Sequence, residues 1–218
     1  MTPAPAATAE FERPPDYRHE IAARGDRVRF LLVPERRYLM IEGTAAPGTQ
    51  GFQDAFGALY PVAYTLHFAL RRRDVDAPVG ALEGLYWVDE PRPIDAARFA
   101  DGPAERGPWS WRLLLPVPDA ASDAEVTAAF AEVERRRKPA LIDRLRCEAW
   151  EEGPAAQIMH VGPYDAEPVT IQRLHGAIAE RGLRPRGCHH EIYISDPNRT
   201  APERLKTVLR QPVEPIER

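Results

Sequence analysis

The order of the predicted secondary structure constrains this chain most, because the same order occurs twice. In the first half, the predicted elements are strands over 27–33 and 38–43, a helix from about 52 to 73, and strands over 81–89 and 109–118. In the second half, they are a strand over 157–161, a helix that Asp165 caps and that ends before Gly182, and strands over 188–195 and 206–213. This repeated order of strand, helix, strand, strand predicts an α+β fold built from a duplicated module.

Short strings of sequence support the duplication. YLMIEG (38–43) aligns with QIMHVG (157–162), EGLYWV (83–88) with HHEIYI (189–194), and RLLLPVP (112–118) with TVLRQPV (207–213). The similarity is weak at each position, but the three strings keep the same order in both halves.

Helix signals place the remaining boundaries. Ser122 and Glu125 form an S-x-x-E capping box, which predicts a helix over about 122–138 that connects the two modules. Pro61 lies inside the first helix pattern, where the loss of one backbone hydrogen bond predicts either a kink or a second helix that begins at Pro61. A T-x-x-E pair, Thr200 and Glu203, predicts one helical turn before the last strand.

The chain divides into an arm and one larger domain. Residues 1–26 show no sustained periodicity and are expected to form a flexible N-terminal arm that packs late or not at all. Residues 27–218 are expected to form the domain, with module one over about 27–120, the connector helix over about 122–138 and module two over about 145–214.

Composition removes several classes of protein. The net charge of −4 and the pI near 5.9 argue against a nucleic-acid partner, and no apolar run is long enough for a membrane span. Cys147 and Cys188 have no C-x-x-C spacing, so we expect reduced thiols in a cytoplasmic protein. The sequence also lacks a Walker loop, a G-x-G-x-x-G turn and a G-x-S-x-G elbow, and no cofactor is expected.

The most informative strand for function is the one over 188–195, CHHEIYIS. Alternation sends His189, Glu191 and Tyr193 to one face and His190 to the other. The two adjacent histidines therefore cannot both reach one ion, and we expect no metal site. A carboxylate in mid-strand must be solvated, paired or kept protonated. Glu191 is thus either half of a cross-strand ion pair or an acid that faces a ligand.

Aromatic residues are dense around the predicted strands and the first helix. They are Tyr60, Tyr64, Tyr86, Trp87, Trp109, Trp111 and Tyr164. Alternation places Glu83, Leu85, Trp87 and Asp89 together on one face of their strand, and Trp109 with Trp111 on one face of the next. Each ring alone is more often part of a core. A cavity for a flat ligand needs such rings with a few polar groups among them. The long Pro/Gly/Asp-rich loop between these two strands is a candidate wall of such a cavity.

Six segments together resemble the GyrI-like small-molecule-binding superfamily, and most closely its stand-alone subfamily that includes cyclopropanoid cyclopropyl hydrolases. They are YLMIEG (38–43), ALYPVAYTLHF (58–68), LEGLYWVD (82–89), WSWRLLLPVP (109–118), EEGPAAQIMHVGPYDAEPVTIQRLH (151–175) and HHEIYISDPNRTAPERLKTVLRQPV (189–213). The resemblance covers the chain from about residue 15 to its end. It implies a duplicated strand-helix-strand-strand module whose antiparallel sheets surround a central ligand cavity.

The resemblance also implies site residues. Glu191 matches the cavity glutamate of many relatives, and Glu83 matches the acid of the family's L-E-G-L-W-W string, so both are candidate catalytic residues. The candidate ligand-binding residues are Trp87, Trp111, Tyr64, Tyr164, Tyr60 and Tyr193. Tyr86 departs from the first Trp of the family string, and Pro61 is unexpected inside the helix.

Three functions follow from the resemblance. The leading hypothesis is a detoxifying hydrolase that binds a flat hydrophobic xenobiotic in an aromatic cage and opens the cyclopropane of a DNA-alkylating compound with water. The alternatives are a protein that sequesters cationic hydrophobic molecules without turnover, or a partner protein that modulates gyrase. A small molecule is the expected partner, and a homodimer remains open.

Overall fold

In a computed structural model of the 218-residue chain, two compact units can be described. The structure describes residues 10–23, 25–44, 49–88, 90–91, 93–94 and 109–216. Unit 1 comprises Met1–Pro34, Glu90–Arg106 and Glu152–Arg218, and unit 2 comprises Glu35–Asp89 and Gly107–Glu151. Both combine helices with antiparallel strands, so the predicted α+β class is confirmed.

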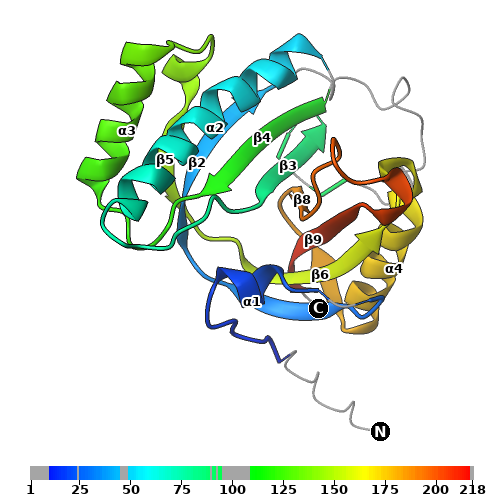
Figure 1. The fold of residues 1–218 in the computed structure, drawn as a ribbon. Helices are drawn as coiled ribbons and strands as arrows, with labels where there is room; N and C mark the ends of the chain where they lie inside the picture. Colours follow the sequence, from blue (N-terminus) through cyan, green and yellow to red (C-terminus); the bar gives the residue numbers. More distant parts are fainter. Residues whose placement is uncertain are drawn as a thin grey trace, which may run out of the picture. The chain divides into compact units, whose positions relative to one another are not determined.

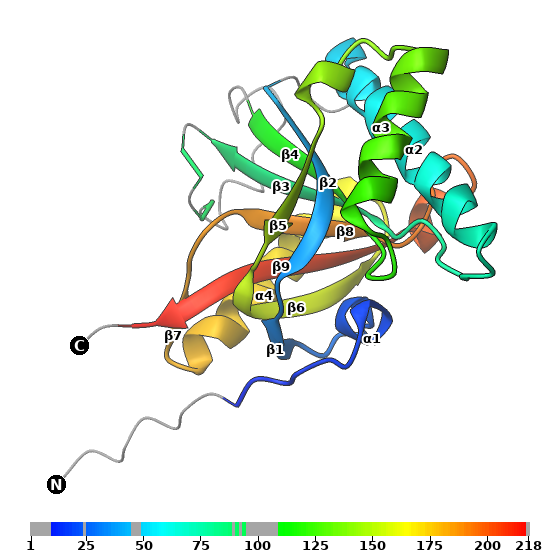
Figure 2. The ribbon, with the colours of Figure 1, turned by 90° about the vertical axis from the view of Figure 1, so that its left-hand side faces the viewer.

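Unit 2 is an antiparallel sheet with two helices (Figure 1). Its elements are β2 (Arg36–Gly43), α2 (Gln50–Arg71), β3 (Leu82–Val88), β4 (Trp109–Pro116), α3 (Asp123–Arg136), a 3-10 turn (Ile142–Arg144) and β5 (Arg146–Trp150). The strands pair in the order β3, β4, β2, β5. Helix α2 packs on β2 and β4, and α3 lies beside α2 (Figure 2).

Helix α2 is continuous through Pro61, so the prediction of a second helix beginning there is wrong. A buried stripe of residues holds it against the sheet; it consists of Phe52, Ala55, Ala58, Leu59, Val62, Leu66 and Leu70. Burying a large apolar side chain stabilises the fold by about 1.5–3 kcal/mol. Together these residues outweigh the ~3 kcal/mol penalty of a proline in a helix interior.

Helix α3 begins where the capping box predicts. The Ser122 hydroxyl accepts a hydrogen bond from the Glu125 backbone N–H at 3.3 Å, and the Ser122 backbone N–H donates to the Glu125 carboxylate at 2.9 Å. The box satisfies two backbone donors that the first turn of a helix would otherwise leave without partners.

The strands of unit 1 also pair antiparallel, and α4 packs against β6 and β9. Its elements are α1 (Tyr17–Ile21), β1 (Arg29–Val33), β6 (Gly153–Val161), a 3-10 turn (Tyr164–Ala166), α4 (Glu167–Glu180), β7 (Leu183–Pro185), β8 (His189–Tyr193), a 3-10 turn (Pro202–Arg204) and β9 (Lys206–Pro215). The strands pair in the order β1, β6, β9, β8, and β7 pairs with the end of β9. Asp165, predicted to cap the helix, lies instead in the 3-10 turn that precedes α4.

The described part of the N-terminal arm, residues 10–23 and 25–26, belongs to unit 1, and its contacts with β1 correct the expectation of a flexible segment there. Glu12 forms a parallel bridge with Leu31, and the Arg29 guanidinium binds the Glu12 carboxylate at 2.7 Å. Glu20 on α1 is completely buried. Hydrophobic periodicity reports only the spacing of apolar residues, so it could not predict these polar contacts.

The units do not follow the two modules expected along the chain. Strand β1, placed in module one, pairs with β6, and β5, which was not predicted, pairs with β2. Each unit therefore contains a strand that lies outside its own strand-helix-strand-strand sequence. Periodicity identifies strands but does not determine which strands pair.

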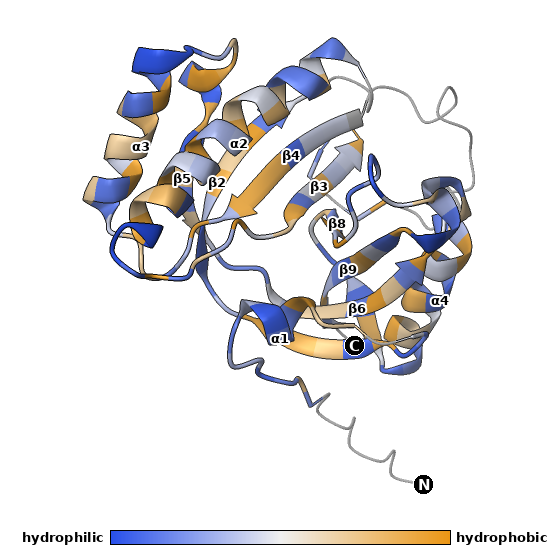
Figure 3. Ribbon diagram, viewed as in Figure 1, coloured by the Kyte–Doolittle hydropathy of each residue, from blue (hydrophilic) through white to orange (hydrophobic). Residues whose placement is uncertain are grey.

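Hydrophobic residues concentrate along β4 and alternate with hydrophilic ones along α2 and α3 (Figure 3). This pattern is typical of helices with one buried face. No helix in the described ranges is both long enough and apolar enough to span a membrane.

Candidate functional site

Strand β8 presents Glu191 and two polar neighbours on the face that α4 packs against. The Tyr193 hydroxyl donates a hydrogen bond to the Glu191 carboxylate at 2.7 Å, and the His189 Nε2 lies 3.4 Å from its other oxygen. The Glu191 side chain is 15% exposed. The predicted alternation is therefore confirmed.

Within the described residues of unit 1, the cross-strand ion pair considered for Glu191 is not formed. Its neighbour on β9 is Leu209, an apolar residue. The carboxylate is held instead by residues of its own strand. A partly exposed carboxylate with one hydroxyl partner keeps further acceptor positions for water or a ligand.

Tyr164 completes this group from the turn before α4. Its ring meets that of Tyr193 edge-on, with 6.0 Å between centroids, and the residue is 41% exposed. Burial, together with the negative charges of Glu167, Glu191 and Asp196, raises the pKa of Tyr164 to about 12. The phenol therefore stays protonated at neutral pH and is a hydrogen-bond donor. We call Glu191, Tyr193 and Tyr164 the β8 acid group.

In unit 2, the strand register separates residues that the sequence had grouped. Trp111 pairs with Tyr86 and with Gly43, whereas Glu83 pairs with Leu114 and Trp87 pairs with Ser110. Cross-strand partners share a face of the sheet. Trp87 and Glu83 therefore lie on one face and Trp111 on the other, so the two tryptophans cannot line one cage within this unit.

Trp111 occupies the core beneath α2. It is 1% exposed, and its ring meets that of Phe52 edge-on at 5.3 Å. Its ring also lies over Gly43, where an added Cβ would be 2.3 Å from a ring carbon. Tyr86, on the same face, lies over Gly84 in the same way. This arrangement is typical of a ring packed over a glycine in a sheet and not of an open stacking wall.

Tyr60 and Tyr64 belong to a row of rings along α2. The row runs Phe52, Phe56, Tyr60, Tyr64 and Phe68, at a spacing of four residues. Tyr60 and Tyr64 stack with 6.1 Å between centroids, and Tyr64 is 48% exposed. The exposed end of this row offers an apolar, stackable surface on unit 2.

Three features named from the sequence lie outside the described residues. They are Asp89, the side chain of Trp109 and most of the loop between β3 and β4, residues 95–108. Glu83 is described and is completely buried.

A cluster of buried charges lies on the opposite face of unit 1, and the sequence reasoning missed it. The His190 Nδ1 lies 2.9 Å from the Glu152 carboxylate, and the Arg210 guanidinium lies 2.9 Å from Glu152 and 3.1 Å from Glu20. All four side chains are at most 1% exposed. We call them the buried charge network.

The network controls the ionisation of Glu152. Burial alone would raise the pKa of this carboxyl, but the charges of His190 and Arg210 and their hydrogen bonds lower it to about 2. The one signal in the sequence was the charged Arg210 in the middle of a predicted strand, because a charged residue that becomes buried requires a partner.

The register also corrects the internal alignment of the two halves. The helix-packed face of unit 2 carries Gly84 and Tyr86, and that of unit 1 carries Glu191 and Tyr193. Aligning EGLYWV with HHEIYI matches Tyr193, on the helix-packed face, with Trp87, on the face away from the helix. Because a slip of one residue reverses the face of every side chain, HHEIYI must be shifted by one residue, which matches Tyr193 with Tyr86 and Glu191 with Gly84.

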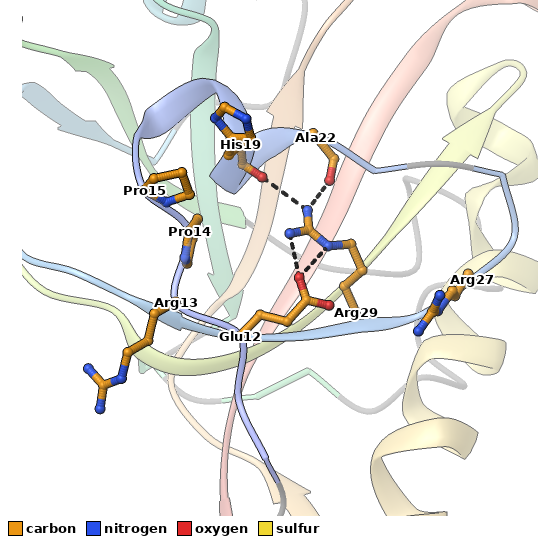
Figure 4. A pocket seen from close by; sticks show the side chains of 8 residues that line it. All are labelled: Glu12, Arg13, Pro14, Pro15, His19, Ala22, Arg27 and Arg29. Carbon is orange, nitrogen blue, oxygen red and sulfur yellow. Dashed lines mark hydrogen bonds and ion pairs between the residues drawn. The ribbon is translucent and has the colours of Figure 1, made fainter.

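A pocket of about 410 Å³ lies between the N-terminal segment and β1 (Figure 4). The Arg29 guanidinium bridges its walls by binding Glu12 and the backbone carbonyls of His19 and Ala22. None of the predicted site residues lines this pocket.

Within the described residues, no three His, Cys, Asp or Glu side chains meet in a way that could hold a metal ion.

Comparisons with known proteins find one family model and several similar solved structures. A model described as GyrI-like small molecule binding domain matches residues 120–214. An uncharacterized conserved protein from Listeria innocua shares 30% identity and a TM-score of 0.79, over 90% of this chain and 96% of that one. A hydrolase from Listeria innocua shares 30% identity and a TM-score of 0.75 over the same fractions.

A more distant likeness concerns the fold alone. The C-terminal domain of EcmrR shares 12% identity and a TM-score of 0.51, over 87% of this chain and 98% of that domain. The chain matches none of the curated proteins.

Proposed function

The chain belongs to the GyrI-like small-molecule-binding domain family, and from this premise we propose that it hydrolyses the cyclopropane ring of cyclopropanoid DNA-alkylating agents. The substrate is a flat hydrophobic xenobiotic, and Glu191 orients the attacking water. The hydrolase from Listeria innocua, with 30% identity along most of the chain, supports a hydrolytic reaction.

The observation that carries the proposal is the β8 acid group. Glu191 has one oxygen bound to the Tyr193 hydroxyl at 2.7 Å, and its side chain is partly exposed. Tyr193 fixes the orientation of the carboxylate, so a water bound to the remaining acceptor positions is also oriented. Such positioning of a general base is worth about a hundred- to ten-thousand-fold in rate.

The reaction balances with few groups. Water attacks the cyclopropane methylene carbon, the bond between that carbon and the dienone ring breaks, and its electron pair passes into the ring to form a phenolate. Glu191 accepts the proton that the water loses and later releases it to solvent, and the phenolate oxygen takes up a proton from solvent. Tyr164, protonated at neutral pH because its pKa is raised to about 12, is the O–H donor of the group that stabilises the developing oxygen charge.

Aromatic rings supply the binding of the flat ring system. Tyr164 and Tyr193 do so in unit 1. In unit 2, Tyr60 and Tyr64 on α2 are candidates for one surface, and Trp87, on the strand face away from α2, is a candidate for another. Trp111 and Glu83 are buried, and we assign them to the structure of unit 2 and not to ligand contact.

The proposal is tested by incubating a cyclopropanoid alkylator with the protein, with the Glu191→Gln variant and without protein, followed by liquid chromatography with mass detection. We expect the water adduct to accumulate beyond the amount of protein. Glu191→Gln should slow its formation by about a hundred-fold or more and leave the dissociation constant within a few-fold.

The matched control is Glu203→Gln, the same chemical change at an exposed turn of unit 1. It should turn over as the natural protein does. Equal activity in Glu191→Gln would remove Glu191 from the mechanism, and the absence of any water adduct with the natural protein would remove the reaction.

A second candidate function, sequestration of cationic hydrophobic molecules, is favoured by the charge around Tyr164. Three carboxylates, Glu167, Glu191 and Asp196, are close enough to raise its pKa. A bound cation would meet these charges and the faces of two tyrosine rings. Binding of a neutral and a cationic compound of equal shape discriminates the functions: equal affinities exclude the counter-ion role of Glu191.

A further inference from the structure

Strand β8 joins the β8 acid group on one face to the buried charge network on the other. His190 and Glu191 are consecutive residues, so their side chains leave the strand in opposite directions. One peptide bond separates the residue that binds Glu152 from the residue that we assign to the chemistry.

The buried charge network holds this part of β8 tightly. The His190 Nδ1 lies 2.9 and 3.1 Å from the two oxygens of Glu152, and neither side chain is exposed. A buried ion whose partner is lost is strongly destabilised, so the imidazole has one strongly preferred position. Fixing the His190 side chain fixes the backbone from which Glu191 projects.

The network extends from β8 to the N-terminal segment. Arg210 is the cross-strand neighbour of His190, and its guanidinium bridges Glu152 and Glu20. The Gln157 side chain binds Arg210 at 2.9 Å and donates to the Glu20 backbone carbonyl at 2.7 Å. Residues far apart in the sequence thus support the face of β8 that carries His190.

We propose that Glu152 is a positioning residue for Glu191, acting through His190 and the backbone of β8. Glu20, on the N-terminal segment, is a second and weaker positioning residue, acting through Arg210. This inference rests on the proposed function, because it assigns the network to the placement of the group that orients water. Displacing a reacting group by about 1 Å can reduce the rate about a hundred-fold.

The first test is single-turnover ring opening by the full chain carrying Glu152→Gln, at a temperature where the variant is folded. We expect the rate of the chemical step to fall about ten- to a hundred-fold while ligand affinity stays within about three-fold. Glu20→Gln should change the rate less. An unchanged rate in folded Glu152→Gln overturns the proposal.

A double-mutant cycle with His190→Gln separates positioning from general damage. If Glu152 acts through His190, adding Glu152→Gln to His190→Gln should change the rate by less than about two-fold. Additive losses overturn the proposed route.

The control is Val133→Ala, which removes buried methyl groups from α3 in unit 2 and should leave the rate per folded molecule unchanged. A fall equal to that of Glu152→Gln contradicts the inference.

A measurement without substrate distinguishes failure of this inference from failure of the proposed function. Nuclear magnetic resonance of the folded Glu152→Gln variant should show shifted backbone amide signals for Glu191 and Tyr193 and a shifted carboxyl carbon signal for Glu191. If the natural protein opens no ring, the proposed function fails while these shifts still report positioning. Unshifted Glu191 and Tyr193 signals overturn the positioning inference even if the protein is a hydrolase.

Discussion

Strands β3 and β8 occupy matching places in the two units but carry different chemistry on the face toward their helix. In unit 2, that face of β3 carries Gly84 under the ring of Tyr86, next to buried Trp111. In unit 1, that face of β8 carries Glu191, bound to Tyr193. The same face is therefore apolar in unit 2, whereas in unit 1 it carries the polar group that we propose acts on a ligand.

The two units also differ in the exposure of their ion pairs. Unit 1 buries the Glu20, Glu152, His190 and Arg210 side chains completely, whereas the Arg112–Glu42 pair of unit 2 is 29% and 34% exposed. Buried charges are costly to separate and exposed ones are not. The difference teaches that unit 1 depends on the partners of its buried charge network, whereas the Arg112–Glu42 pair of unit 2 can be lost at little cost.

The largest expected effect is that of Arg210→Met, which leaves two buried carboxylates without their cation. We expect the free energy of unfolding to fall by about 3–5 kcal/mol. The matched change in unit 2, Arg112→Met, should lower it by less than about 1 kcal/mol. Urea unfolding is followed for unit 2 by tryptophan fluorescence, because all four tryptophans lie there. Unit 1 is followed by the His190 resonances. Similar losses for both variants would refute the contrast.

Acid should weaken unit 1 through Glu152. Its pKa is lowered from 4.5 to about 2 in the folded protein, so its contribution is complete above about pH 4.5 and is lost as the pH falls through about 2. The contribution is about 3 kcal/mol. The gap in unfolding free energy between the natural protein and Glu152→Gln should therefore narrow between pH 5 and pH 2. A gap that is constant over this range would contradict the assignment.

A smaller effect is expected where unit 2 depends on packing. Gly84→Ala places a Cβ 2.7 Å from the Tyr86 ring, and we expect a loss of about 1–3 kcal/mol by overpacking. Gly57→Ala in α2 meets no atom within 4 Å and should stabilise the protein by about 0.5–1 kcal/mol. Thermal unfolding measures both, and a neutral Gly84→Ala would show that Tyr86 can move away freely.

The smallest effect concerns the capping box of α3. Ser122→Ala removes the acceptor for the Glu125 backbone N–H and should lower the free energy of unfolding by about 1 kcal/mol. Thr127→Ala, on the same helix, removes a hydroxyl bound to the Asp123 carbonyl and should change stability by a few tenths of a kcal/mol. The urea midpoints of the two variants measure these losses. Equal midpoints would show that the capping hydroxyl stabilises α3 no more than the Thr127 hydroxyl does.

Local patterns in the sequence determined much of the fold. The capping box placed the start of α3, and alternation along 188–195 correctly put His189, Glu191 and Tyr193 on one face of β8. Both signals are local, because a cap spans four residues and strand alternation needs only the neighbouring positions. The α+β class followed in the same way, from the periods of the individual segments.

Only the tertiary structure decided the pairing of strands and the partners of charges. Nothing in the sequence paired β1 with β6, placed Trp87 and Trp111 on opposite faces, or brought Glu20 to Arg210 across 190 positions. The physical reason is that strand register and burial of an ion depend on residues distant in the chain. A segment's own period cannot specify them.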